Sequence, residues 1–366
     1  MASAVSGQAC ATLSASSFTT QDSAARTAAF MACGQCPSLS GEGLCLTTTS
    51  FRLFAKPADR RNSMFKTTVL AGFLALVSLA NSWAANAGTV LEGQKMPSRI
   101  LGKDVEYTVY LPPKYEAGNR SYPVIYLMHG GGKGKNTDWY RFGGADRVFD
   151  RMIESGEVPA FIAVTPEGRR DKENRFNTYY MNDADGGYRW QDMFLQEFVT
   201  YIDHTYRTVP EKEGRGILGL SMGGYAAIAF SFKRPEMFSA AAALSAAFRT
   251  DGQVVEMDQS GYDRRYGKAW GLGLAGKGRL NAAYHDNSVL DLVETIPAEQ
   301  IGKTALYMDC GSSDDFFAGN SELHLKLQKL GVEHRFIARE GGHDWAYWRS
   351  GLPEALSFVG ASFRNG

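Results

Sequence analysis

Short apolar runs alternate with helical patterns from about residue 88 to the end of the chain. Apolar runs bounded by glycine, proline or polar residues are typical of strands, and fully apolar ones are typical of strands covered on both faces. The predicted strands are Val105–Leu111, Val124–Met128, Phe161–Val164, Gly216–Leu220, Ala240–Leu244, Ala305–Met308 and His334–Ala338. The predicted helices are Ala145–Glu154, Gln191–Tyr206, Gly224–Arg234, Ser321–Leu330 and Pro353–Phe363. This alternation predicts an α/β fold with a mostly parallel sheet and helices on both faces.

Residues 247–300 interrupt the alternation. The segment combines several glycines with the large aromatic residues Tyr262, Tyr266, Trp270 and Tyr284. We interpret it as an insertion that lies over the sheet.

The residues before position 88 have a different character. Residues 1–63 are rich in Ser, Thr and Ala and lack apolar periodicity, which indicates a disordered leader or upstream translation. Residues 64–87 combine a charged start, the apolar run Val69–Ala80 and a small-residue cleavage site ending at Ala87. These are the parts of a secretory signal peptide, and the apolar run is too short for a membrane anchor. We therefore expect a secreted or periplasmic domain at 88–366, with a two-part organelle leader as the alternative.

Charge and cysteine usage narrow the classes of function. The chain has 39 basic and 39 acidic residues, which argues against general affinity for nucleic acid or an anionic membrane. Four of its five cysteines lie in the first 45 residues, so Cys310 has no partner for a disulfide within the later domain. That domain contains no His-x-x-x-His pair or cysteine cluster, and we predict neither metal nor cofactor. The oligomeric state stays open.

Ser221 is the candidate nucleophile. It lies in Gly219-Leu-Ser-Met-Gly-Gly224, between a predicted strand and a predicted helix. A serine on such a strand-to-helix turn requires small neighbours, because the turn is tight. The Gly-x-Ser-x-Gly pattern alone is weak evidence for a nucleophile. Its position between a predicted strand and a predicted helix is what supports the hypothesis.

A glycine run after an earlier strand supplies the candidate oxyanion hole. His129-Gly-Gly-Gly132 follows Val124–Met128, and consecutive glycines let backbone N–H groups approach an anionic oxygen. An oxyanion hole of this kind uses one N–H from the loop, here from Gly131 or Gly132, and one from the residue after the nucleophile, here Met222. We expect His129 to order the backbone rather than transfer a proton.

His343 is the candidate base. It lies on a glycine-rich loop after the last predicted strand, where α/β sheets place their sites, whereas the other histidines fall in predicted helices, a strand or the insertion. The base needs a carboxylate to orient it, and Asp314 and Asp315 lie in the loop after Ala305–Met308. Asp309 is still at the strand end, where a structural role is expected. The order Ser, Asp, His along the chain is that of α/β-hydrolases.

Together these motifs resemble the putative-esterase (esterase D-like) group of α/β-hydrolases over roughly residues 95–364. The resemblance is closest to carbohydrate esterase family one, with its feruloyl and acetyl xylan esterases. It implies an α/β-hydrolase fold in which Ser221, His343 and Asp314 form the triad, with Asp314 preferred over Asp315. It also implies that Met222 and the region of Gly131 and Gly132 hold the oxyanion.

The resemblance suggests a substrate class. It implies a secreted serine carboxylic ester hydrolase that removes feruloyl or acetyl groups from plant cell-wall xylan. Four aromatic residues are candidates for contact with a phenolic acid or sugar ring, with core packing as the alternative for each: Tyr179, Tyr180, Trp270 and Trp345. Other readings are a small-ester hydrolase like S-formylglutathione hydrolase, an acyltransferase of the mycolyltransferase type, and a catalytically silent binding protein.

Overall fold

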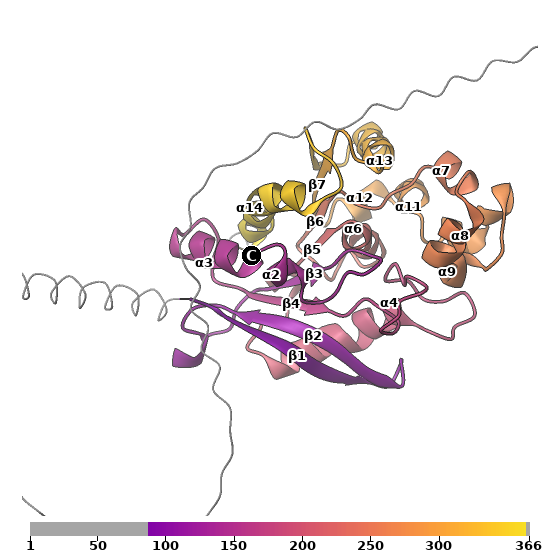
Figure 1. Ribbon diagram of the computed structural model, residues 1–366. Helices are drawn as coiled ribbons and strands as arrows, with labels where there is room; N and C mark the ends of the chain where they lie inside the picture. The colour runs from indigo at the N-terminus through magenta and orange to yellow at the C-terminus, as the bar shows by residue number, and fades with distance from the viewer. Residues whose placement is uncertain (1–86, 364–366) are drawn as a thin grey trace, which may run out of the picture. The chain divides into compact units, whose positions relative to one another are not determined.

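An eight-stranded sheet runs through the part of the chain that the computed structural model describes, residues 87–363 (Figure 1). The predicted leader and nearly all of the predicted signal peptide lie outside the described residues. The strand order is β1-β2-β4-β3-β5-β6-β7-β8. The strands are β1 Thr89–Ser98, β2 Lys103–Leu111, β3 Val124–Met128, β4 Ile162–Pro166, β5 Arg215–Leu220, β6 Ala240–Leu244, β7 Ala305–Gly311 and β8 Arg335–Arg339.

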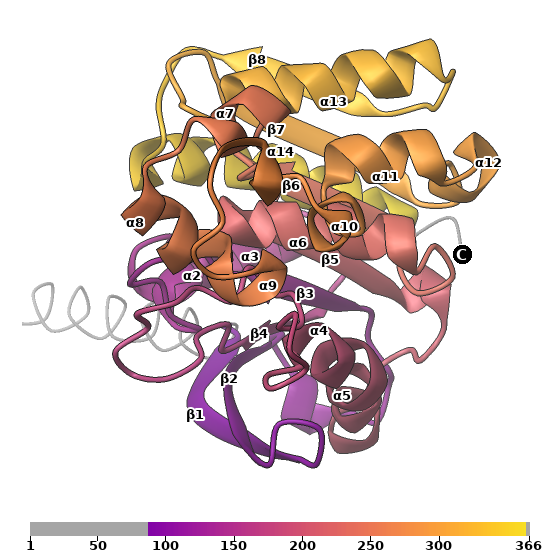
Figure 2. The same ribbon diagram turned by 90° about the vertical axis from the view of Figure 1, so that its right-hand side faces the viewer.

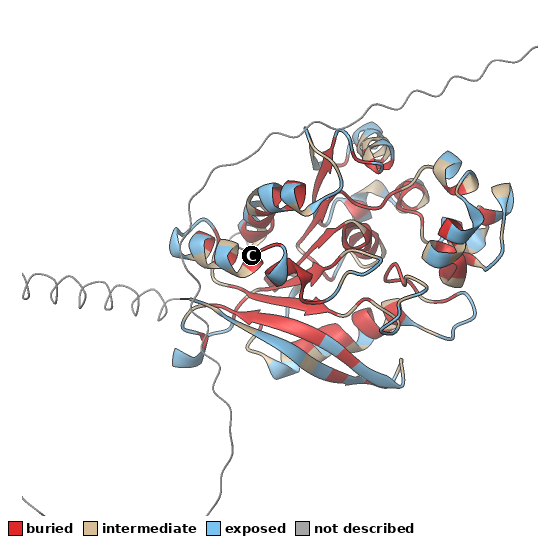
Figure 3. Ribbon diagram, in the orientation of Figure 1, coloured by how far each residue is buried: buried red, intermediate tan, exposed pale blue. Residues whose placement is uncertain are grey.

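Strand direction divides this sheet into two parts. β1 and β2 run antiparallel to their neighbours, whereas β4, β3, β5, β6, β7 and β8 are all parallel. Every residue of β3, β4 and β6 is buried, as expected of parallel strands covered on both faces (Figure 3). The predicted α/β-hydrolase fold class is confirmed.

Two helical layers cover the sheet. One apolar cluster joins α3 and α14 to one face, and a second joins α6, η2, α5 and α13 to the other (Figure 2). The helices that form these layers are α2 Asp138–Arg141, α3 Ala145–Glu154, α4 Trp190–Asp192, α5 Val199–Thr205, α6 Met222–Lys233, α13 Phe317–Lys329 and α14 Trp345–Ser362. A π-helical stretch, η2 Met193–Phe198, joins α4 to α5. Short 3₁₀ turns are η1 Tyr115–Ala117 and η3 Lys212–Gly214.

Residues 247–300 form a helical insertion, as predicted, but it packs on helices rather than on the sheet. Its central helix α11 lies against α6 and α13. In Figure 1 the insertion is the orange group beside α6. Its elements are α7 Asp251–Val255, α8 Gln259–Tyr262, η4 Asp263–Gly267, α9 Lys268–Trp270, η5 Gly276–Arg279, α10 Ala282–His285, α11 Val289–Thr295 and α12 Ala298–Ile301.

Strand β1 and the start of helix α14 differ from the sequence prediction. Strand β1 was not predicted, because most of its residues are exposed or half-buried and it lies at the sheet edge, where a strand needs no apolar run. Helix α14 begins at Trp345 instead of Pro353, so Pro353 lies inside it. Asp344 caps this earlier start by accepting the Tyr347 N–H at 2.9 Å.

Candidate active site

Ser221 occupies a strained turn between β5 and α6. Its φ of 54° and ψ of −120° lie in a region that non-glycine residues rarely adopt. The turn is held from both sides, because the Ser221 N–H donates to Leu244 O (2.9 Å) and the Ala247 N–H donates to Ser221 O (2.9 Å). A Cβ on Gly223 would lie 2.0 Å from Met128 O, so this turn requires glycine there. The local geometry is that of the predicted nucleophile elbow.

His343 lies between Ser221 and Asp314. Its Nε2 is 2.9 Å from Ser221 Oγ, and its Nδ1 is 2.8 Å from Asp314 Oδ2. The imidazole ring also packs edge-on against Phe316 (4.9 Å between ring centres) and Trp348 (4.9 Å). These rings fix the plane of the imidazole, and the three polar side chains are within hydrogen-bond distance as a Ser–His–Asp relay requires.

The Asp314 carboxylate is buried and charged. Burial by itself would raise its pKa, but the hydrogen bonds from His343 and from the Phe316 N–H (2.9 Å to Oδ1) outweigh burial, and the pKa lies below its usual range. Its neighbour Asp315 is exposed. Asp309 instead accepts two hydrogen bonds from Arg339, at 3.0 and 2.8 Å, as a structural pair. Among these three carboxylates, the structure brings Asp314 to His343.

The predicted oxyanion donors have different surroundings. Met222 is the first residue of α6, so its N–H belongs to the helix start, where donors lack an intrahelical acceptor. Gly131 lies beside it, since a Cβ on Gly131 would be 3.3 Å from Met222 Sδ. The Gly132 N–H, however, donates to Asn177 Oδ1 at 3.1 Å. Gly132 therefore holds the loop in place, and Met222 and Gly131 are the two positions that leave a donor for an oxyanion.

Asn174 and Asn177 are loop residues that the sequence analysis did not single out. Asn174 Nδ2 donates to Gly132 O (2.5 Å) and to Asn177 Oδ1 (3.1 Å). With the Gly132 N–H bond, both polar groups of Gly132 are bound by side chains from a distant loop. No motif marks these asparagines, and their only sequence signal is their place in a polar loop after β4.

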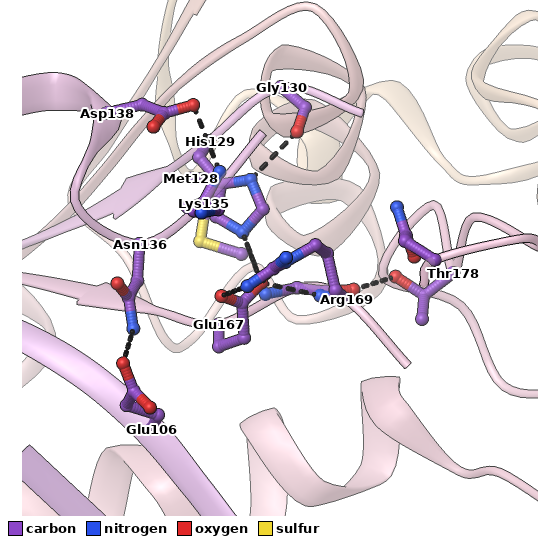
Figure 4. A network of polar contacts seen from close by, with 12 residues as sticks. Glu106, Met128, His129, Gly130, Lys135, Asn136, Asp138, Glu167, Arg169 and Thr178 are labelled. Carbon is purple, nitrogen blue, oxygen red and sulfur yellow. Dashed lines mark hydrogen bonds and ion pairs between the residues drawn. The ribbon is translucent and has the colours of Figure 1, made fainter. Parts of the chain in front are cut away.

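His129 orders backbone, as expected. Its Nδ1 is 2.8 Å from Gly130 O, and its Nε2 accepts the Gly168 N–H at 2.8 Å. Figure 4 shows the buried ring between Gly130 and the Glu167–Arg169 pair. Because both ring nitrogens are occupied, His129 anchors the start of the glycine loop to the loop that follows β4.

A cavity of about 760 Å³ opens beside Ser221 and His343 at the carboxyl edge of the parallel strands. Trp345 lines it and packs edge-on against Trp139, at 6.0 Å between ring centres. The other three aromatic candidates do not line this cavity. Tyr180 is fully buried and donates its hydroxyl to His129 O (2.8 Å), so it supports the glycine loop from the core.

Tyr179 and Trp270 are also buried, and both pack with Tyr266. The Trp270 and Tyr266 rings are stacked at 3.9 Å between centres. Their position between the insertion and α6 makes them part of the packing that holds the insertion on the domain.

The described residues form neither a metal-binding cluster nor a membrane-spanning helix. Within residues 87–363, no cluster of three or more His, Cys, Asp or Glu side chains has the arrangement to hold a metal ion. Across the same range, no helix has the length and apolar character needed to span a bilayer.

The fold and the Ser221–His343–Asp314 geometry define an α/β-hydrolase. The sequence pattern of the putative-esterase family matches residues 98–359. The chain belongs to this family, which confirms the resemblance seen in the sequence.

Several proteins similar to this chain are named esterases or feruloyl esterases. An esterase of Mycobacterium tuberculosis is 26% identical over 266 residues, 68% of this chain and 54% of that protein. An endo-1,4-β-xylanase/feruloyl esterase of Xylanibacter ruminicola is 32% identical over 145 residues, 38% of this chain and 19% of that protein. A solved ferulic acid esterase is 29% identical with a TM-score of 0.64, covering 76% of this chain and 99% of that one. The chain thus spans about half the length of the mycobacterial relative.

Proposed function

We propose that the protein is a serine carboxylic ester hydrolase that acts through Ser221, His343 and Asp314. The observation that carries this proposal is the position of His343, with one ring nitrogen 2.9 Å from Ser221 Oγ and the other 2.8 Å from Asp314 Oδ2. A serine hydroxyl is a weak nucleophile at neutral pH, and a base in this position activates it.

The first half of the reaction forms an acyl-enzyme. Ser221 Oγ attacks the ester carbonyl carbon while its proton moves to His343 Nε2. The Asp314 carboxylate, whose lowered pKa keeps it charged, stabilises the resulting imidazolium. When the C–O bond to the alcohol breaks, His343 gives its proton to the leaving alcohol.

The second half repeats the steps with water. A water molecule transfers a proton to His343 and attacks the acyl carbon, and the proton then returns to Ser221 Oγ as the carboxylic acid leaves. The N–H groups of Met222 and Gly131 are the donors for the negative oxygen of both tetrahedral intermediates. Such donors act strongly because they are already oriented, and removing one typically costs about 10²–10³-fold in rate.

We propose feruloyl or acetyl groups on plant xylan as the substrate. Support comes from the relatives named ferulic acid esterase and xylanase/feruloyl esterase. The open cavity of about 760 Å³ beside Ser221 is large enough for a sugar or phenolic ring, and Trp345 presents an aromatic surface to it.

We also propose that the domain is exported. The support is the sequence of residues 64–87, with its charged start, apolar run and small-residue end. Expression of the full chain, followed by N-terminal sequencing of exported protein, tests this. We expect the exported form to begin at Gly88, and retention of residue 64 in all of it would contradict the proposal.

The test of the activity is release of ferulate from methyl ferulate, and of acetate from acetylated xylan, by the purified protein. Ser221→Ala is the matched variant because it removes one oxygen from the site. We expect the parent to release at least one of the two acids and the variant to release neither. Equal activity of parent and variant would refute the role of Ser221, and no release from either substrate by the parent would refute the substrate class.

A further inference from the structure

The cavity beside Ser221 is lined by an excess of basic residues. Five of its lining residues are lysines or arginines, whereas the two acidic ones are Asp138 and Glu173. The chain as a whole has equal numbers of basic and acidic residues. The excess of positive charge is therefore local to this cavity and does not reflect the net charge of the protein.

The carboxylates that pair with the two arginines belong to a second cavity. Arg141 pairs with Glu92, and Arg169 pairs with Glu167 at 2.8 Å. Glu92 and Glu167 line a neighbouring cavity of about 360 Å³ and do not line the one at Ser221, although both arginines line both cavities. The acids thus neutralise the arginines from the side of the second cavity, and they place no negative charge at Ser221.

Three lysines supply positive charge that stays unpaired. Lys133, Lys135 and Lys172 line the cavity and are exposed, and in the described part of the chain none of their ammonium groups has an ion-pair or hydrogen-bond partner. Of the two lining acids, Asp138 is buried and accepts the Lys135 N–H at 3.0 Å. Glu173 is exposed. Three unpaired ammonium groups therefore stand against one exposed carboxylate.

Two of these lysines are tied to the oxyanion loop. Lys133 is two residues after Gly131, so their Cα atoms are at most about 7 Å apart. Lys172 is two residues before Asn174, whose side chain donates to Gly132 O. The backbones of both lysines are therefore positioned by the same contacts that hold the oxyanion loop.

The same cavity has an aromatic surface. Trp345 and Phe142 both line it, and their tilted rings are 5.9 Å apart between centres. Phe142 is 55% exposed, so its ring is open to a ligand. An aromatic face can contact a sugar or phenolic ring, and ammonium groups bind an anionic oxygen. The lining residues therefore suit an ester that carries both a ring and a negative charge.

We propose that Lys133, Lys135 and Lys172 select esters that carry a carboxylate, as a uronic acid unit does. The inference rests on the proposed esterase function and adds to it the charge of the substrate. Charges of one sign in a concave site concentrate their field, which raises the local concentration of an oppositely charged substrate. A carboxylate at these ammonium groups lies beside the oxyanion loop, so an ester group close to it reaches Ser221. The lysines bind substrate and take no part in proton transfer.

The first test compares p-nitrophenyl hydrogen adipate, which is anionic, with p-nitrophenyl hexanoate, a neutral ester of the same acyl length. The quantity measured is the ratio of their kcat/KM values at low salt, in the parent and in Lys133→Gln/Lys135→Gln/Lys172→Gln, the cavity variant. We expect the ratio to fall about 10-fold in the cavity variant, because three ammonium groups near the carboxylate are lost. The ratio cancels any loss of activity that the two esters share.

The matched control removes three exposed lysines that do not line this cavity, as Lys95→Gln/Lys277→Gln/Lys329→Gln. This control variant has the same net charge as the cavity variant, and we expect it to keep the parent ratio. Salt gives a second readout, since the Debye length is about 30 Å at 0.01 M and about 3 Å at 1 M. The charge preference of the parent should therefore be lost at 1 M salt, whereas the ratio in the cavity variant should change little.

The second test finds the side of the ester that carries the acid. Acetate release is measured on acetylated glucuronoxylan and on the same polymer with its carboxyl groups reduced to alcohols. A preference for the acidic polymer that the cavity variant loses assigns the carboxylate to the alcohol side, whereas a lysine-dependent preference for the adipate ester assigns it to the acyl side. If the cavity and control variants show equal preferences in both comparisons, the proposal is overturned, because the lysines are then only a solvated surface.

A binding measurement separates this proposal from the esterase assignment. Calorimetry at low salt uses Ser221→Ala protein with and without the three cavity substitutions. The probes are xylotriose bearing a glucuronic acid unit, compared with plain xylotriose, and adipate, compared with adipamide. Binding of either acid that requires the lysines supports the proposal even if no ester is hydrolysed. Ester hydrolysis without any lysine-dependent preference for charge overturns this proposal alone, and the absence of both hydrolysis and acid binding overturns both proposals.

Discussion

Two glycine-rich turns meet at Ser221, and they are held in different ways. At the elbow, backbone packs on backbone: a Cβ on Gly219 would lie 2.1 Å from Gly223 O, and one on Gly223 would lie 2.0 Å from Met128 O. In the oxyanion loop, a Cβ on Gly132 would meet nothing within 4 Å. This loop is instead held by the side chains of Asn174 and Asn177.

The difference is between packing by backbone and packing by side chains. The elbow packs on backbone of α6 and β3, which leaves room only for glycine at positions 219 and 223, so its motif is readable in a short stretch of sequence. The oxyanion loop depends on partners more than 40 residues away, since the Gly132–Asn177 bond spans 45 positions. We therefore expect substitutions at the elbow to act on folding and substitutions around the loop to act on rate.

The largest expected effect comes from Asp314, the carboxylate that contacts His343. Asp314→Asn should lower kcat by roughly 10⁴-fold, about 5.5 kcal/mol, because the amide favours the wrong imidazole tautomer and leaves the imidazolium unpaired. Steady-state kinetics measure this loss, with Asp315→Asn as the matched control. A loss of similar size in Asp315→Asn would show that the assignment of the acid is wrong.

A pair of alanine substitutions tests the comparison directly. Gly223→Ala should destabilise the fold by at least about 3 kcal/mol, because its Cβ meets backbone of β3 that cannot give way. Gly132→Ala has open space and costs only its left-handed backbone (φ 65°), about 1–2 kcal/mol. Denaturant unfolding of both variants measures the difference. Equal destabilisation would remove the distinction between the two turns.

A smaller effect is expected for the side chain that holds the oxyanion loop. Asn177→Ala should lower kcat about 10-fold with KM within about twofold, because it loosens a loop that presents a donor without removing the donor itself. Steady-state kinetics and thermal unfolding are measured together, with the exposed Asn119→Ala as control. A parallel loss of folded protein and of rate would mean that Asn177 supports the fold alone.

The smallest expected effect is on the pH dependence of folding stability, which should differ between Asp138 and Asp314. Burial raises the pKa of Asp138, which follows the glycine loop, whereas the pKa of Asp314 is lowered. A raised acid pKa means that the folded state gains less from ionisation than the unfolded state, so stability falls as pH rises from about 4 through the folded pKa. Asp138→Asn should therefore gain stability relative to the parent at pH 7 but not at pH 3.5.

Thermal unfolding at both pH values measures that gain. The opposite sign is expected for Asp314, whose contribution is present above about pH 4 and is lost as pH falls through its folded pKa. A gain for Asp138→Asn that is the same at both pH values would contradict the role of ionisation.

The sequence predicted the parallel core and missed what lies at its borders. All seven predicted strands are present. Five of them are short apolar runs, which have few alternatives to a covered strand. Strand β1 was not predicted, because an edge strand needs no apolar run. The start of α14 was predicted wrongly, because proline is typical of the first turn of a helix and Pro353 was taken as that residue. The helix is in fact capped by Asp344, nine residues earlier.

For the candidate site too, the sequence predicted some residues and did not place others. Ser221, His343 and Asp314 were found because each lies in a short motif at the end of a strand, and parallel strands bring their carboxyl ends to one edge. Tyr179, Tyr180 and Trp270 were candidates for substrate contact, with core packing as the alternative, and the structure places all three in the core. Residue type alone does not tell a core ring from a ring that lines a cavity.

The sequence by itself determined the α/β order, the nucleophile turn and the candidates for the triad. These depend on local backbone requirements and on the period of apolar residues, which a short stretch of chain contains in full. Only the tertiary structure decided that Gly132 is held by Asn177 and that His343 contacts Asp314. Those facts depend on which side chains meet across more than 25 positions, and such meetings follow from the packing of the whole domain.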